Sequence, residues 1–129
     1  MRLLLVDDEP AALERLSALL TQVSDVEVVG QARNGREAAE AVEALKPDLV
    51  LLDIQMPERS GLDVAAGLPL EERPEIVFVT AFDEFAVEAV EVNALDYLLK
   101  PVRAQRLLGA LKRAQTLLPA EHLEAIDQL

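Results

Sequence analysis

Four short apolar runs of this chain each end at polar side chains. The runs over 3–6, 49–52, 76–79 and 97–99 lead directly into Asp7 and Asp8, Asp53, Thr80, and Lys100, in that order. As parallel strands, these runs would place their carboxyl ends at one edge of a sheet, where open α/β sheets bind their ligands. Three carboxylates, a hydroxyl and an ammonium at that edge predict a site for a cation and a phosphoryl group.

The length and the charge of the chain limit what else it can be. Its 129 residues, 51% of them hydrophobic, suffice for one domain that buries about two-thirds of its unfolded surface. The 24 acidic residues outnumber the 12 basic ones and give a net charge of -12, which repels the phosphate backbone of nucleic acids. We therefore expect no direct binding of DNA by these residues.

The chain carries no cysteine and no long apolar segment. This composition excludes a disulfide framework, a thiolate metal site and a cysteine nucleophile, and it suits a reducing cytosol. The apolar start ends at Asp7, well short of the about 7–15 residues in the core of a signal peptide. No run approaches the length of a membrane span. We therefore expect a cytoplasmic protein with no membrane partner.

Short, continuously apolar runs alternate with longer amphipathic ones along the chain. This rhythm is typical of βαβ units around a parallel sheet that is buried on both faces. The second strand ends without an acidic residue and is predicted at an edge beside the first, so strands one and three become neighbours at the topological switch point. The prediction is an α/β fold with a single five-stranded parallel sheet, doubly wound as (βα)5, with strands near 2–6, 26–30, 48–52, 75–79 and 96–99 and helices near 9–22, 35–45, 61–67, 83–92 and 103–118.

Asp7, Asp8 and Asp53 would meet at this switch point. Like charges at close range raise one another's pKa unless a cation compensates them. Mg²⁺ is the natural compensator, because it takes oxygen ligands and binds through one or two carboxylates together with a substrate phosphate. For Asp7 and Asp8 alone, a solvated helix N-terminus with a favourable dipole interaction remains an equal alternative.

Asp53, Thr80 and Lys100 have the chemistry that phosphoryl transfer to a carboxylate requires. A carboxylate can attack phosphorus and become an aspartyl phosphate. A hydroxyl can donate to a phosphoryl oxygen, and an ammonium can neutralise its charge. Taken singly, Thr80 is also an ordinary β-branched strand residue, and Lys100, which Pro101 follows, is also an ordinary solvated strand end.

In this order and spacing, the motifs resemble the receiver domain of bacterial two-component response regulators over residues 1–118. The resemblance implies a flavodoxin-like architecture with strand order 2-1-3-4-5. It also implies a phosphoacceptor domain that catalyses only its own phosphorylation and dephosphorylation and is not otherwise an enzyme. One departure is Glu58, at a position where the family frequently has glycine. The motifs that carry the resemblance lie at 3–10 (LLLVDDEP), 51–57 (LLDIQMP), 60–63 (SGLD), 79–81 (VTA) and 96–101 (DYLLKP).

The resemblance also implies a role for each site residue. Asp53 would accept the phosphoryl group from a sensor histidine kinase, and Thr80 and Lys100 would contact that group. Thr80 and Tyr97 would be the switch residues that change the surface of the fourth helix, fifth strand and fifth helix, and Lys100-Pro101 resembles the family's cis peptide. The ligands implied for Mg²⁺ are Asp7, Asp8, Asp53 and the backbone carbonyl of Gln55.

Residues 80–86 and 92–97 are most similar to receivers of the LytTR class. This similarity implies a transcription factor that binds DNA only through an output domain. Because Pro119 would end the last helix, residues 1–118 are interpreted as the receiver domain and 119–129 as the start of a linker to a missing C-terminal domain. A stand-alone receiver that acts through protein binding is the alternative.

Two other classes of protein share parts of this pattern. Phosphatases of the haloacid dehalogenase kind also use a strand-end aspartate with Mg²⁺, but residues 53–55 lack their second aspartate two positions on. A flavodoxin-like binding protein would have a phosphate loop rich in Ser, Thr and Gly, where this chain has acidic residues and proline at 7–10. Neither class accounts for Thr80 and Lys100 as well as the receiver does.

The fourth and fifth predicted helices carry opposite charges. A two-fold homodimer would pair the acidic helix of one chain with the basic helix of the other. The favoured alternative is a solvated surface with intramolecular pairs, because exposed ion pairs are weak. The acidic residues are Asp83, Glu84, Glu88 and Glu91, the basic ones are Arg103, Arg106, Lys112 and Arg113, and the residues expected to face the sheet are Leu107, Leu108, Leu111 and Leu118.

Overall fold

The computed structural model describes residues 1–69, 71 and 73–118, and in them five strands alternate with five helices. The strand order is β2-β1-β3-β4-β5, and every neighbouring pair is parallel. This confirms the predicted doubly wound α/β fold and its strand order. The elements are β1 (Arg2–Val6), α1 (Pro10–Leu20), β2 (Glu27–Ala32), α2 (Gly35–Leu45), β3 (Leu49–Leu52), α3 (Gly61–Gly67), β4 (Glu75–Thr80), α4 (Ala86–Glu91), β5 (Asp96–Leu99) and α5 (Ala104–Thr116).

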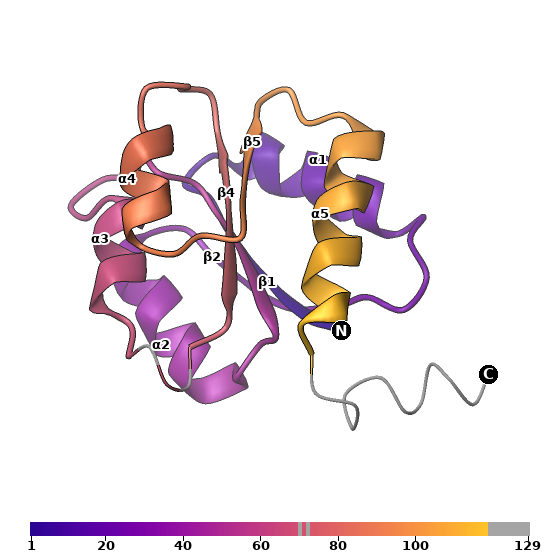
Figure 1. Cartoon of the computed structure of the whole chain (residues 1–129), viewed down its shortest axis with the longest axis horizontal. Coiled ribbons are helices and arrows are strands. Elements are labelled where there is room, and N and C mark those ends of the chain that lie inside the picture. The colour runs from indigo at the N-terminus through magenta and orange to yellow at the C-terminus, as the bar shows by residue number, and fades with distance from the viewer. Residues whose placement is uncertain (70, 72, 119–129) are drawn as a thin grey trace.

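Helices cover both faces of the sheet (Figure 1). α1 and α5 lie on one face, where Leu5 of β1 packs with Leu16 and Leu107 of the two helices. α2, α3 and α4 lie on the other face, where Phe78 of β4 packs with Val64 of α3. Because successive strand residues point to opposite faces, continuously apolar runs are what a sheet covered on both sides requires.

Side-chain caps and a left-handed residue mark the ends of two helices. The Asn34 side chain accepts a hydrogen bond from the N–H of Glu37 at 2.8 Å and caps the start of α2. The Ser60 hydroxyl accepts one from the N–H of Asp63 at 3.1 Å and caps α3. α2 ends at Leu45, and its C-cap Lys46 has a φ of 48°, in the left-handed region. These local signals explain why both helices occupy their predicted residues.

α4 is shorter than the helix predicted over 83–92. It spans Ala86–Glu91, and Phe85 at its N-cap provides no side-chain hydrogen bond. Asp83 and Glu84 suggested an earlier start, because acidic residues favour the first turn of a helix. Without a capping side chain before them, however, the first backbone N–H groups of such a helix have no partner. The prediction was therefore wrong by three residues at this end.

The apolar stripe of α5 also differs from the prediction. Leu108 was expected to face the sheet, but it is 37% exposed. Leu118, beyond the end of the helix, is only partly buried. Leu108 lies one position off the buried stripe, which follows the spacing i, i+3, i+4, i+7. That stripe consists of Leu107, Ala110, Leu111 and Ala114.

Other boundaries agree more closely with the sequence. β1, β5, α2 and α3 occupy their predicted residues, whereas β2 begins one residue later and ends two residues later than predicted. The segment 119–129, predicted to begin a linker, lies outside the described residues. Across the residues that the structure describes, no helix combines the length and the apolarity that a membrane crossing requires.

Candidate functional site

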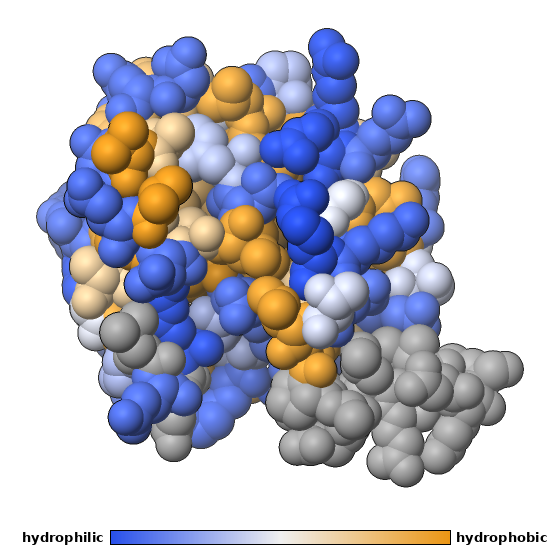
Figure 2. Space-filling view, in the orientation of Figure 1, coloured by the Kyte–Doolittle hydropathy of each residue, from blue (hydrophilic) through white to orange (hydrophobic). Residues whose placement is uncertain are grey.

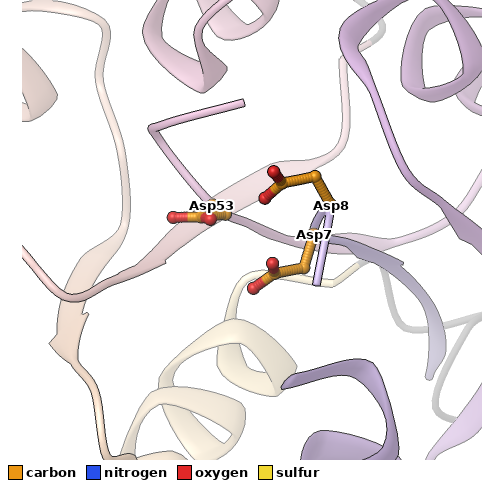
Figure 3. A group of neighbouring side chains, drawn as sticks. All are labelled: Asp7, Asp8 and Asp53. Atoms are coloured by element: carbon orange, nitrogen blue, oxygen red, sulfur yellow. The ribbon is translucent and has the colours of Figure 1, made fainter. Parts of the chain in front are cut away.

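Three carboxylates gather at the carboxyl ends of β1 and β3 (Figure 3). Asp7 and Asp8 follow β1, Asp53 follows the neighbouring strand β3, and one oxygen of each lies within 4.8 Å of the others. The N–H of Asp53 donates to the carbonyl of Val6 at 2.9 Å and joins the two strand ends. Asp7 and Asp53 are buried and Asp8 is half-buried. The structure thus brings together the three acidic residues that the sequence placed at the switch point.

The Lys100 ammonium reaches this cluster from the end of β5. Its Nζ lies 2.7 Å from Asp7 Oδ2 and 3.5 Å from Asp53 Oδ2, with the exposed Glu9 carboxylate at 3.9 Å. The backbone N–H of Lys100 donates to the carbonyl of Thr80 at 2.8 Å, so β4 fixes the end of β5. Burial alone would lower the pKa of Lys100, but the hydrogen bond and charge of Asp7 and the charges of Asp53 and Glu9 raise it. The ammonium therefore stays protonated.

The cluster is short of positive charge. Burial and the nearby Asp7 raise the pKa of Asp53 from its usual 3.8 to about 6. Lys100 and the N–H of Ile54, which donates to Asp53 Oδ1 at 2.8 Å, lower it by less. The buried Asp7 Oδ2 has the Lys100 ammonium at 2.7 Å and no further hydrogen-bond donor in the described part of the chain. When all three aspartates are ionised, one ammonium leaves two negative charges of this cluster uncompensated.

These side chains fit a divalent cation that prefers oxygen ligands. Mg²⁺ binds carboxylate and carbonyl oxygens, and its charge equals the deficit of the cluster. The buried Asp7 Oδ2, whose partner among the described residues is the Lys100 ammonium, has room in its coordination for a further positive ligand. Gln55, implied to contribute its carbonyl, lies in an exposed position two residues beyond Asp53, and its role stays a prediction.

Thr80 and Tyr97 lie on the neighbouring strands β4 and β5 and share one contact residue. Thr80 is fully buried, and its hydroxyl accepts a hydrogen bond from the N–H of Phe82 at 3.4 Å. The Tyr97 hydroxyl donates to the carbonyl of the same Phe82. The loop between β4 and α4 therefore connects the two predicted switch residues, and the sequence pattern did not indicate Phe82 as this connection.

Gly61 is a site residue whose structural role the sequence did not reveal. Its N–H donates to the carbonyl of Ile54 at 2.7 Å. A Cβ atom at this position would lie 2.1 Å from the carbonyl oxygen of Asp53. Only a residue without a side chain allows the start of α3 to approach the end of β3 this closely. The motif at 60–63 contained the residue, but nothing in it signalled contact with the Asp53 backbone.

The loop after Asp53 also contains a strained residue. Glu58 has a φ of 69°, in the left-handed region that favours glycine. Glycine adopts this conformation without a clash between Cβ and backbone. The departure from the family pattern at Glu58 therefore has a conformational cost.

The surface of α4, β5 and α5 separates apolar and acidic side chains from basic ones. Figure 2 shows apolar patches over α4, where Val87 and Val90 are 68% and 75% exposed, and a strongly hydrophilic surface over α5. Asp96 at the start of β5 pairs with Arg106, whose Nη2 lies 3.5 Å from Oδ1, and also with Arg113. Two of the four basic residues of this region thus have partners within the chain, as the favoured alternative predicted.

Comparison with known families accounts for this arrangement. The sequence model of the family described as response regulator receiver domain matches residues 3–112, which include all the predicted site residues. The chain belongs to this family. The receiver domain explains why the acidic pair, the strand-end aspartate, the threonine and the lysine occur together at one edge of a five-stranded sheet.

Relatives of this receiver domain are transcriptional regulators. The transcriptional regulatory protein BtsR of Salmonella typhi is 51% identical over 113 residues, covering 88% of this chain and 47% of that protein. The positive alginate biosynthesis regulatory protein of Pseudomonas aeruginosa is 52% identical over 116 residues, with the same coverage. The crystal structure of the response regulatory domain of mrkE from Klebsiella pneumoniae superposes with a TM-score of 0.83 at 36% identity, covering 90% of this chain and 96% of that one. The chain spans about half the length of the curated relatives it matches.

Proposed function

We propose that this receiver domain accepts a phosphoryl group on Asp53 from a sensor histidine kinase. A carboxylate oxygen of Asp53 forms a bond to the phosphorus of a phosphohistidine while the phosphorus–nitrogen bond breaks, and the imidazole leaves with that electron pair. The domain catalyses this transfer and the later hydrolysis of its own aspartyl phosphate, and no other reaction. The observation that carries the proposal is the buried Asp53 carboxylate with the Lys100 ammonium 3.5 Å away.

Mg²⁺ is the proposed cofactor, held by Asp7, Asp8, Asp53 and the carbonyl of Gln55. When bound, it supplies positive charge against the phosphoryl oxygens. The charge deficit of the carboxylate cluster and the buried Asp7 Oδ2 support this assignment. Lys100 supplies a second cation, because its Nζ already lies between Asp7 and Asp53 and reaches a group on Asp53 by a side-chain movement alone.

Thr80 and Tyr97 are proposed to transmit phosphorylation to the surface. The Thr80 hydroxyl accepts only a long hydrogen bond of 3.4 Å from Phe82, so it is available to donate to a phosphoryl oxygen. The phosphoryl group adds a charge of about -1.5 to -2 by analogy with other phosphorylated side chains. Because the Tyr97 hydroxyl is bonded to the same Phe82, movement of Thr80 would shift the β4–α4 loop and then the surface of α4, β5 and α5.

The proposed output is transcription through a LytTR-class DNA-binding domain. Two observations support it: the relatives are named as transcriptional or biosynthesis regulators, and the chain covers about half their length. Residues 1–118 would be the receiver domain and 119–129 the start of the linker, and DNA would contact only the output domain. A stand-alone receiver is the alternative, which the reading frame downstream distinguishes. The cytoplasmic location stays a prediction.

Homodimerisation through α4, β5 and α5 also stays a prediction. α4 itself carries no basic residue, whereas Arg103 at the N-cap of α5 and Lys112 on α5 are exposed. A two-fold axis would bring these two regions together in a homodimer, whereas the favoured alternative, a solvated surface with intramolecular pairs, predicts a monomer. Light scattering with and without a phosphoryl mimic distinguishes the two, and a monomer in both states contradicts the homodimer.

Intact-mass measurement with a small acyl phosphate donor tests the phosphoacceptor assignment. Wild-type protein should gain one phosphoryl group with Mg²⁺ and none without it. Asp53→Asn should gain none in either condition, because it lacks the attacking carboxylate. Asp63→Asn is the matched control, since Asp63 is exposed on α3 and should be labelled like wild type. Undiminished labelling of Asp53→Asn would overturn the proposal.

A further inference from the structure

We propose that Arg15 of α1 is a positioning residue for Lys100, an inference that rests on the proposed phosphoryl transfer to Asp53. Arg15 Nη2 donates a hydrogen bond to the backbone carbonyl of Val102 at 3.0 Å. Val102 lies two residues beyond Lys100, in the loop between β5 and α5. The contact therefore connects α1 directly to the loop that carries the ammonium of the site.

The backbone on both sides of Lys100 is held by contacts from other elements. On the β5 side, the backbone N–H of Lys100 itself donates to the carbonyl of Thr80 at 2.8 Å. On the α5 side, the Val102 side chain is 3% exposed and packs in the core beneath α1 and α5. The backbone carbonyl of Val102 accepts the hydrogen bond from Arg15. No other donor in the described part of the chain bonds that carbonyl. Arg15 is thus the hydrogen-bonding partner on the far side of the loop.

The segment around α1 and the loop after β5 also meet in a second contact, the ion pair between Asp7 and Lys100. Phosphorylation should affect this ion pair and the Arg15–Val102 hydrogen bond differently. α1 begins shortly after Asp7, which pairs with the Lys100 ammonium at 2.7 Å. In the proposed transfer, the Lys100 ammonium moves toward a phosphoryl oxygen on Asp53, and this movement changes its ion pair with Asp7. The bond from Arg15 to Val102 involves neither reacting group, so it persists. Arg15 therefore keeps the loop in place while the Lys100 side chain changes its partner.

The chemistry of arginine suits this task. A guanidinium donor to a carbonyl oxygen makes a charge-assisted hydrogen bond, which is stronger than a neutral one. Lysine has one ammonium nitrogen on a shorter, more flexible side chain, without the planar fork of a guanidinium, and would hold the same carbonyl less well. Because Arg15 is otherwise exposed, replacing it opens no cavity in the core. Its substitution should therefore change the position of the loop and leave the fold intact.

The first test compares the phosphorylation rates of variants with a small acyl phosphate donor, which removes any effect of kinase docking. Arg15→Ala should lower the rate roughly five-fold, because a small displacement of a reacting group carries a large rate penalty. Arg15→Lys should fall between Arg15→Ala and wild type. Arg36→Ala is the control, since Arg36 is exposed on α2 and its side chain makes no hydrogen bond or ion pair within the described residues. The Mg²⁺ affinity should change less than two-fold in all three.

The second test repeats the comparison in a Lys100→Ala background. If Arg15 acts through Lys100, Arg15→Ala should have no further effect there. If Lys100→Ala protein is labelled too slowly, the same four proteins can be compared by their Mg²⁺-dependent affinity for beryllofluoride, a phosphoryl mimic. An equal loss in both backgrounds, or an unchanged rate in Arg15→Ala, would overturn the inference. Failure of the wild-type protein to be labelled would instead contradict the proposed function.

Discussion

Charged side chains lie at both ends of the strands, which we call the amino edge and the carboxyl edge of the sheet. The charges at the amino edge have partners, whereas those at the carboxyl edge are only partly compensated. At the amino edge, Arg2 donates to two carbonyls at the end of α2, at 2.5 and 3.0 Å. Arg73 donates to two carbonyls at the end of α4, at 2.5 and 2.9 Å. At the carboxyl edge, three carboxylates share one ammonium, and the buried Asp7 Oδ2 has no other donor in the described part of the chain. The two guanidinium groups at the amino edge are thus compensated by backbone carbonyls, whereas the carboxylates at the carboxyl edge lack enough positive charge.

This difference separates stability from function within one sheet. Cations at the C-termini of helices interact favourably with the last carbonyls and with the helix dipole, so the amino edge stabilises the fold. Crowded carboxylates disfavour their own ionisation, so the carboxyl edge gains from any ligand that brings positive charge. Substitutions at the amino edge should therefore change the free energy of unfolding and leave the rate of phosphorylation unchanged, whereas substitutions at the carboxyl edge should change that rate.

Gly61→Ala should have the largest effect, because it disturbs the geometry of the carboxyl edge itself. The new Cβ would lie 2.1 Å from the Asp53 carbonyl, so the backbone must shift. We expect the free energy of unfolding to fall by about 1–3 kcal/mol and the labelling rate to fall about ten-fold or more. Urea unfolding and intact-mass kinetics measure the two effects.

Gly109→Ala is the matched control for this substitution. A Cβ at Gly109 on α5 would meet only the flexible end of Arg113, at 4.0 Å. Because alanine favours a helix interior over glycine, this variant should be more stable by about 0.5–1 kcal/mol and labelled normally. If Gly61→Ala matched wild type in both measurements, the close approach of α3 to Asp53 would not matter to the site.

Arg73→Met tests the amino edge. It removes the guanidinium that bonds the Val92 and Asn93 carbonyls at the end of α4. We expect a loss of about 1–2 kcal/mol of unfolding free energy, the range for a charge-assisted hydrogen bond in a partly exposed position. The rate of labelling by a small phosphodonor should not change. Arg36→Met provides the comparison on an exposed surface, and a large fall in the labelling of Arg73→Met would contradict the separation of the two edges.

Among the substitutions that test the two edges, Asp53→Asn should have the smallest effect on stability, and it should stabilise the protein. Because the pKa of Asp53 is raised from 3.8 to about 6, the folded chain binds more protons than the unfolded chain between these values. Its contribution to stability without metal therefore decreases as pH rises through that window and stays low above it. At pH 7, Asp53→Asn should be more stable than the wild type by about 1 kcal/mol, because the neutral amide removes a charge that burial and Asp7 disfavour.

Urea unfolding of both proteins between pH 4 and 8, in the presence of a chelator, measures this difference. The difference in stability should grow as pH rises from about 4 to about 6 and then remain constant. Mg²⁺ should stabilise the wild type more than Asp53→Asn, because the variant lacks one ligand charge. A difference that shrinks as pH rises would show that the carboxylates are not crowded as the structure places them.

The sequence was sufficient wherever a local pattern marks both ends of an element. β5 and α3 have their predicted bounds because an apolar run or a capping residue lies directly at their ends. The convergence of Asp7 and Asp53 also followed from the pattern, since the ends of parallel strands share an edge. The assignment of roles to these residues rests on the family resemblance and stays a prediction.

Other features depend on contacts between segments that the pattern does not connect. The short α4 reflects the missing cap at Phe85, which acidic residues alone do not reveal. Gly61 is needed because of the Asp53 backbone, and Arg73 because of carbonyls at the end of α4. Such contacts become visible only when the distant segments are placed side by side.

Locating the phosphoryl group directly is the most decisive measurement. Borohydride reduces an aspartyl phosphate to homoserine, and fragmentation mass spectrometry then identifies the residue that carried it. After incubation with a phosphodonor and Mg²⁺, we predict homoserine at position 53 and at no other aspartate. Homoserine at Asp7 or Asp8, or a protein that yields none under these conditions, would contradict the account of the carboxyl edge as a phosphoryl-accepting site.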